Sequence, residues 1–139
     1  MTVETYQIRL KTQGDADAHN ISEAVANILN DSPLMNGLAT VFCPSATSGV
    51  TTIEFEEGCV TDMRRLFDEV ANPNRHYAHN ARWGDGNGHS HVRAALLGPS
   101  ITIPFANGRL TLGTWQQIIY LDFDNRPRQR ELVVQLMGE

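Results

Sequence analysis

Residues 100–138 read SITIPFANGRLTLGTWQQIIYLDFDNRPRQRELVVQLMG, and this stretch decides the fold class. Runs rich in β-branched and large apolar residues alternate here with two turn signals, Asn107-Gly108 and the DNRP of residues 124–127. The Asn-Gly pair is typical of a tight β-hairpin turn. Because three or four strands follow one another with no helix between them, the sequence favours an α+β fold over a doubly wound α/β fold.

The first hundred residues mix strands with helices. Residues 5–12 alternate apolar and polar side chains, which predicts a half-buried strand, and residues 38–44 and 50–55 read as two more strands. Apolar residues at helical spacing predict helices over residues 20–31, 58–70 and 90–97. In the third helix we expect Ser90 as the N-cap and Gly98 just past the end. We therefore predict one domain over residues 1–139, with a mixed or antiparallel sheet and two to three helices.

Composition limits the classes of partner. The formal net charge is −5, which argues against a nucleic-acid binder. No segment has the roughly 20 apolar residues that span a bilayer, and no signal peptide opens the chain. The two cysteines, Cys43 and Cys59, each lie in an apolar run and are expected to be reduced core thiols. These features predict a cytoplasmic protein that binds neither membrane nor nucleic acid.

Four of the five histidines fall between residues 76 and 91, in a stretch that ends HNARWGDGNGHSH. Neutral imidazole is the commonest protein ligand for zinc and related ions, and an aspartate can complete such a set. We therefore predict a divalent metal, zinc or magnesium, held by His79, His89 and His91 with help from Asp85. If the chain is extended here, His89 and His91 point to the same side.

Two other readings of this stretch stay open. If Ser90 caps a helix, the glycine-rich backbone before it, with Asn87 and Arg109 as further donors, would bind a phosphate. Alternatively, Asn, Asp and Gly are ordinary turn formers and the stretch is structural. Asp85 favours a functional reading, because the three neighbouring glycines already supply the turn geometry.

Polar residues elsewhere are further candidates. Glu54 interrupts an apolar strand and is interpreted either as an outward-facing residue or as a metal ligand or general base. The segment PSATSG places Ser45, Thr47 and Ser48 between two predicted strands. It is either a hydroxyl-rich turn or a phosphate-binding loop.

Three motifs together resemble the YjbQ-like family, also called the secondary thiamine-phosphate synthase family. They are the stretch from Asp85 to His91 with the LLGPS that follows soon after, GRLTLGTWQ at residues 108–116, and TTIE ending at Glu54 with Asp62 beyond it. The resemblance covers nearly the whole chain.

The resemblance implies an α+β fold, a homotrimer and a polar cleft near the subunit boundary. The apolar run WQQIIYLDF is expected to cover such a subunit interface. The implied activity joins a hydroxymethylpyrimidine diphosphate to a thiazole phosphate and releases diphosphate. Asp85, Glu54 and His91 would be the catalytic residues, and Ser45, Thr47, Ser48, Asn87 and Arg109 would bind the phosphorylated substrates. The alternative is a trimeric metal- or phosphate-binding protein without this turnover.

The sequence departs from the family pattern at one position. Many members carry HTT or HTS after the second strand, and the position that matches the histidine holds Ser45 in this chain. If that histidine is a metal ligand in the family, this chain lacks it.

Overall fold

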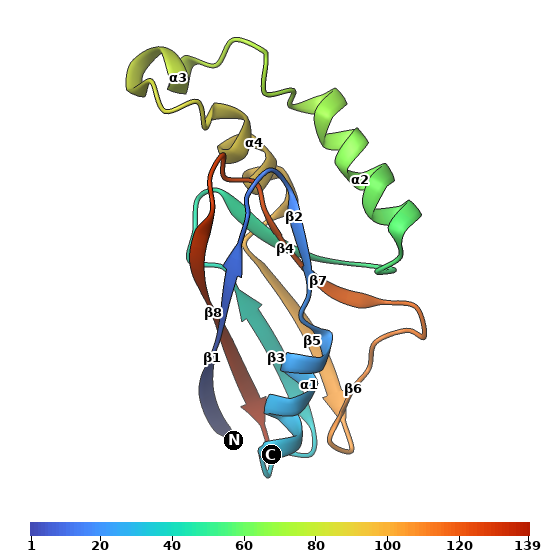
Figure 1. The fold of residues 1–139 in the computed structure, drawn as a ribbon. Helices are drawn as coiled ribbons and strands as arrows, with labels where there is room; N and C mark the ends of the chain where they lie inside the picture. Colours follow the sequence, from blue (N-terminus) through green and yellow to red (C-terminus); the bar gives the residue numbers. More distant parts are fainter.

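Two antiparallel sheets and four helices form the protein, and a computed structural model describes all of residues 1–139 (Figure 1). The helices are α1 (Ser22–Asp31), α2 (Glu57–Val70), α3 (Ala78–Trp83) and α4 (Gly88–Leu97). The strands are β1 (Thr2–Thr12), β2 (Asp17–Asn20), β3 (Gly37–Phe42), β4 (Ser48–Ile53), β5 (Ser100–Ala106), β6 (Arg109–Leu110), β7 (Gln117–Asp122) and β8 (Arg128–Gly138). The predicted α+β class is confirmed. None of the helices has the length and hydropathy that a membrane crossing requires.

The larger sheet has the strand order β1-β8-β3-β5-β6. Strands β1 and β8 pair along their whole lengths, from Thr2 opposite Gly138 to Thr12 opposite Arg128. On β8, Leu132, Val134 and Leu136 are fully buried while the residues between them are at least partly exposed. This period of two places one face of the sheet on the core and leaves the other face open.

The smaller sheet has the order β2-β7-β4 and lies at the centre of the molecule. Ile118 and Tyr120 of β7 join the main core, whereas Ile119 and Leu121 join a second cluster with Phe67 of α2. Both faces of β7 are therefore covered. The expectation that the WQQIIYLDF run covers a subunit interface is wrong for β7, because the strand is the protein's own interior. Trp115 and Gln116, before the strand, are the exposed residues of the run.

Helix α2 connects to the second cluster through Phe67, whose ring centroid lies 4.8 Å from that of Phe123. The helix begins after Glu56, whose carboxylate accepts hydrogen bonds from the backbone N–H groups of Gly58 and Cys59. Both bonds lower the pKa of Glu56, because they favour its charged form. The helix start is thus fixed by a residue outside the apolar stripe.

Several predicted boundaries differ from the structure. Helix α4 begins at Gly88 with Asn87 in the N-cap position, and Ser90 lies within the first turn. The predicted end is confirmed, since Gly98 follows the helix with φ 101°. Helix α3 lies in a stretch where apolar residues do not recur at helical spacing, so no helix was predicted there. The strand that follows the Asn107-Gly108 turn, β6, is only two residues long. Cys43 is a core thiol as expected, but Cys59 is only half-buried on α2.

Candidate metal centre

Three of the predicted functional residues meet at one end of the molecule. His79 comes from α3, Asp85 from the loop between α3 and α4, and His91 from α4. The Nε2 atom of His79 lies 3.0 Å from Oδ2 of Asp85, and the two histidine rings have centroids 4.4 Å apart. One ligand atom from each residue lies within 4.8 Å of the others. We call these three residues the His-Asp-His cluster.

The loop between α3 and α4 brings the cluster together by reversing the chain. Helix α3 ends at Gly84, and Gly86 follows, both with positive φ (64° and 67°), a conformation that glycine adopts without strain. Gly88 packs so closely on Tyr77 that a Cβ atom there would overlap with the tyrosine Cβ. The glycines of this stretch therefore serve the turn, as their composition predicts.

The carboxylate of Asp85 is held on both sides. Its Oδ2 contacts His79, and its Oδ1 accepts a hydrogen bond from the backbone N–H of Asn87 at 3.1 Å. The contact with His79, followed by the bond from Asn87, holds the pKa of Asp85 below its ordinary value. Asp85 is therefore ionised near neutral pH, which is the form that ligates a metal.

His89 is not part of the cluster. Successive helical residues are rotated by about 100°, so His89 and His91 point in nearly opposite directions on α4. His89 turns inward, is 4 % exposed, and its Nδ1 has no hydrogen-bond partner. Burial, with the nearby charge of Arg93, lowers its pKa. The prediction that His89 and His91 share a side required an extended chain, and the helix excludes it.

The donor set of the cluster fits a transition metal better than magnesium. Two imidazoles and one carboxylate are ligands that zinc takes readily, whereas magnesium is usually held by oxygen atoms. Three protein ligands leave coordination positions open, as in catalytic zinc sites. The cluster is partly exposed: the side chains of His79 and Asp85 are 33 % and 43 % exposed.

A buried ionic network lies beneath the cluster, and the sequence analysis missed it. Asp122 and Asp124, on and just after β7, are 0 % and 1 % exposed. Arg130 of β8 donates to both Asp122 oxygens at 2.7 and 2.9 Å, and its guanidinium lies 3.6 Å from Asp124. Arg128 lies 3.1 Å from Asp124. The sequence holds one signal of this network. Two aspartates, Asp122 and Asp124, interrupt the end of an apolar run, and two arginines, Arg128 and Arg130, follow shortly after.

Thr47 and Asn87, two of the predicted phosphate-binding residues, contact this network. The Thr47 hydroxyl donates to Asp124 at 3.0 Å and accepts from Arg130 at 2.9 Å, and the Asn87 amide donates to Asp124 at 3.2 Å. Ser45 lies near Thr47 and accepts a hydrogen bond from its backbone N–H. Ser48 is buried on β4, and its hydroxyl has no partner. The structure gathers these residues near the cluster, but Thr47 and Asn87 already have protein partners.

Several backbone donors at the N-terminus of helix α4, where a phosphate was predicted, already have protein partners. The N–H of Asn87 donates to Asp85, and the N–H of Gly88 donates to Oδ1 of Asn80 at 2.8 Å. Ser90 is not the cap, because its hydroxyl is buried and its single proton faces two acceptors, the Asn87 side-chain oxygen at 2.7 Å and the Phe123 carbonyl at 2.6 Å. The loop therefore fills this helix terminus with its own side chains.

Glu54 and Arg109 are not brought to the cluster. Glu54 is exposed after the end of β4, beside the start of α2, where its closest side-chain partner is the Cys59 thiol at 4.0 Å. Arg109 begins β6, at the opposite end of the molecule from α3 and α4 (Figure 1). The two residues therefore have no common site with the histidines within one chain.

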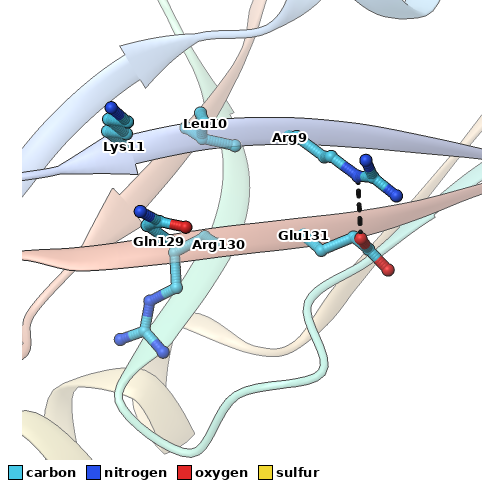
Figure 2. A pocket seen from close by; sticks show the side chains of 6 residues that line it. All are labelled: Arg9, Leu10, Lys11, Gln129, Arg130 and Glu131. Carbon is cyan, nitrogen blue, oxygen red and sulfur yellow. Dashed lines mark hydrogen bonds and ion pairs between the residues drawn. The ribbon is translucent and has the colours of Figure 1, made fainter.

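A separate polar hollow of about 570 Å³ lies on strands β1 and β8 (Figure 2). Its lining residues are Arg9, Leu10, Lys11, Gln129, Arg130 and Glu131. Arg9 is paired with Glu131 at 3.0 Å, and the Arg130 guanidinium is engaged with Asp122. Lys11 is the one cation of this lining without an ion-pair partner, so the hollow carries little unpaired charge.

The fold and the cluster define a class: a small α+β protein with two antiparallel sheets and a His-Asp-His cluster at one end. The family described as UPF0047 protein YjbQ-like matches residues 6–139, and the chain belongs to this family. A UPF0047 protein of Methanothermobacter thermautotrophicus is 34 % identical over 139 residues, covering 100 % of this chain and 95 % of the relative. The UPF0047 protein YugU of Bacillus subtilis is 35 % identical, with 94 % and 97 % covered.

Solved structures confirm the YjbQ-like fold. A hypothetical protein from Aeropyrum pernix K1 superposes with a TM-score of 0.91 at 31 % identity, covering 98 % of this chain and 99 % of that one. A YbjQ-like protein from Sulfolobus solfataricus P2 gives a TM-score of 0.89 at 27 % identity, covering 99 % and 100 %.

Proposed function

We propose that this protein is a metal-dependent enzyme whose His-Asp-His cluster holds a zinc or similar divalent ion. The observation that carries the proposal is the convergence of three ligand atoms within 4.8 Å from three separate segments. When bound, such an ion would supply Lewis-acid stabilisation of phosphate oxygens. The open coordination positions are the place for a phosphorylated small molecule.

The reaction we propose is the one that the family resemblance implies. The thiazole nitrogen attacks the methylene carbon of hydroxymethylpyrimidine diphosphate, the C–O bond breaks, and diphosphate leaves with the bonding electrons. This chain's residues would orient the leaving group: ionised Asp85 and the two histidines of the cluster would fix the position of the cation that the diphosphate needs.

One observation favours the second candidate, a metal- or phosphate-binding protein without this turnover. Glu54 and Arg109, which would supply a base and a phosphate-binding guanidinium, lie away from the cluster. In a homotrimer, Glu54 and Arg109 could reach the cluster only from a neighbouring subunit. The enzyme therefore needs residues from two subunits at one site, whereas the binding protein does not.

We further propose that the protein is a homotrimer in the cytoplasm. Helix α4 exposes Val92 and Leu96, and α2 exposes Leu66 and Val70, each pair on one face of its helix. Exposed apolar residues of this kind support a subunit interface. Light scattering coupled to gel filtration tests the state: we expect three times the chain mass, and a monomer at micromolar concentration contradicts the trimer.

Zinc titration of the purified, tag-free protein tests the metal centre, and turnover tests the reaction. We expect one ion bound per chain, and formation of thiamine phosphate from the two precursors only in the metal-loaded protein. Binding of zinc and inorganic phosphate without turnover supports the second candidate. Absence of any zinc, manganese or cobalt binding overturns the metal centre, and absence of phosphate binding as well overturns both candidates.

A further inference from the structure

The turn between β7 and β8 contacts the α3–α4 loop through three consecutive residues. The Phe123 carbonyl accepts a hydrogen bond from the Ser90 hydroxyl at 2.6 Å. The Asp124 carboxylate accepts from the Asn87 side chain at 3.2 Å. The Asn125 side chain donates to the backbone carbonyl of Asp85 at 2.7 Å.

These contacts converge on Asn87, which lies between two members of the His-Asp-His cluster. Its side-chain oxygen accepts from Ser90 and from the Asn125 backbone N–H, and its own backbone N–H donates to the Asp85 carboxylate. Asn87 is 6 % exposed, and its bond with Ser90 is buried. Moving the turn would therefore move Asp85 and the start of α4 together.

We propose that Asp124 and Asn125 are positioning residues of the metal centre: through Asn87 and the Asp85 backbone they set the placement of the Asp85 carboxylate relative to His79 and His91. The inference rests on the proposed metal centre. Neither residue belongs to the cluster: Asn125 donates directly to the Asp85 backbone, and Asp124 acts through Asn87, whose backbone N–H donates to the Asp85 carboxylate. Partners of this kind commonly change metal affinity by 10- to 100-fold when they are removed.

The two residues differ in what else they support. Asp124 also contacts Thr47, Arg128 and Arg130, so changing it disturbs the ionic network and the fold. Asn125 is exposed, and its side chain bonds only to Asp85. Asn125→Ala removes that one bond and leaves the network and the backbone bond to Asn87 intact. It is the variant that separates positioning from stability.

The experiment compares the native protein, Asn125→Ala and a control, Gln129→Ala, an exposed amide on β8 that has no hydrogen bond to the loop. Zinc dissociation constants are measured by competition with a chromophoric chelator, and unfolding free energies by urea. Amide hydrogen exchange of Asn87 is measured without metal. For Asn125→Ala we expect at least ten-fold weaker zinc binding, faster Asn87 exchange and native-like stability. The control should match the native protein in all three.

Unchanged zinc affinity and unchanged Asn87 exchange in Asn125→Ala overturn the inference. A loss of affinity that follows a loss of stability in the same variant also overturns it, because the residue is then merely structural. If the native protein binds no zinc while Asn125→Ala still releases the Asn87 amide, the metal centre fails but the positioning of Asp85 by the turn stands.

Discussion

Replacing Asp85 with asparagine separates the metal-binding role of this residue from its role in the loop. Asparagine keeps an oxygen that can accept the hydrogen bond from the Asn87 N–H, now 3.1 Å long, but it loses the charge. The 3.0 Å contact with His79 is partly exposed, with side chains 33 % and 43 % accessible, so its loss costs no more than about 1 kcal/mol of folding free energy. We therefore expect the unfolding free energy to change by about 1 kcal/mol or less.

Zinc affinity should respond much more strongly to the same change. The carboxylate is one of the three candidate ligands of the His-Asp-His cluster, and in the proposed metal centre its charge would offset that of the cation. We expect Asp85→Asn to weaken zinc binding at least ten-fold, which corresponds to about 1.4 kcal/mol. Chelator competition measures the affinity, and urea unfolding measures stability on the same preparations.

Asp62→Asn provides the matched control. Asp62 is also an exposed aspartate in an ion pair, 3.2 Å from Arg65, but it lies on α2 away from the cluster. The control should keep native affinity and native stability. Native zinc affinity in Asp85→Asn would refute its role as a ligand, and a large loss of stability with affinity retained would show that Asp85 is a turn residue.

Three further predictions concern stability. Asp124→Asn should lower the unfolding free energy by about 3 kcal/mol, more than any exposed aspartate change, because Arg128 loses its one ion-pair partner and Arg130 keeps only Asp122; a change below 1 kcal/mol in urea unfolding contradicts this. His89 has a lowered pKa in the folded state, so the unfolded chain binds its proton more readily and stability should fall as the pH drops below about 6.5. Urea titrations at pH 7.5 and 5.5 should show a smaller pH effect in His89→Gln. Phe67→Ala should lower the unfolding free energy by about 3–5 kcal/mol, because it leaves a cavity beside Phe123. Thermal unfolding measures the change, and a melting temperature close to the native one contradicts the prediction.

The strands and the long helices were predictable because their signals are local. Alternation in residues 5–12 and the Asn107-Gly108 turn correspond to β1 and to the β5–β6 hairpin. Helix α3 was not predictable from periodicity, since none of its residues is buried and it has no apolar stripe. Two hydrogen bonds fix its C-terminal end: the Gly84 backbone N–H donates to the Asn80 carbonyl, and the Gly88 backbone N–H donates to the Asn80 side-chain oxygen.

The candidate site was predictable in part. Clustering of histidines around Asp85 pointed to the correct segment, and His79, Asp85 and His91 do meet. His89 lies outside the cluster because α4 begins at Gly88, two residues before the cap expected at Ser90. The Ser90 hydroxyl instead bonds to the carbonyl of Phe123, a tertiary contact that local sequence does not reveal. The ion pairs of Asp122 and Asp124 join residues only four to eight apart, but the bond from Thr47 to Asp124 spans 77 residues, and no local pattern could predict that partner.

The position of β8 in the larger sheet has a consequence for how the chain folds. This strand follows every other element in the sequence, yet it lies between β1 and β3 and pairs with both. Until residues 128–138 have been synthesised, β1 has no partner and β3 presents an open edge. Sheet completion must therefore close a loop of more than a hundred residues, from Thr12 to Arg128, and contacts of such long range form slowly. Nascent chains without β8 would expose two pairing edges at once, so chaperone dependence and aggregation during synthesis should concentrate in this interval.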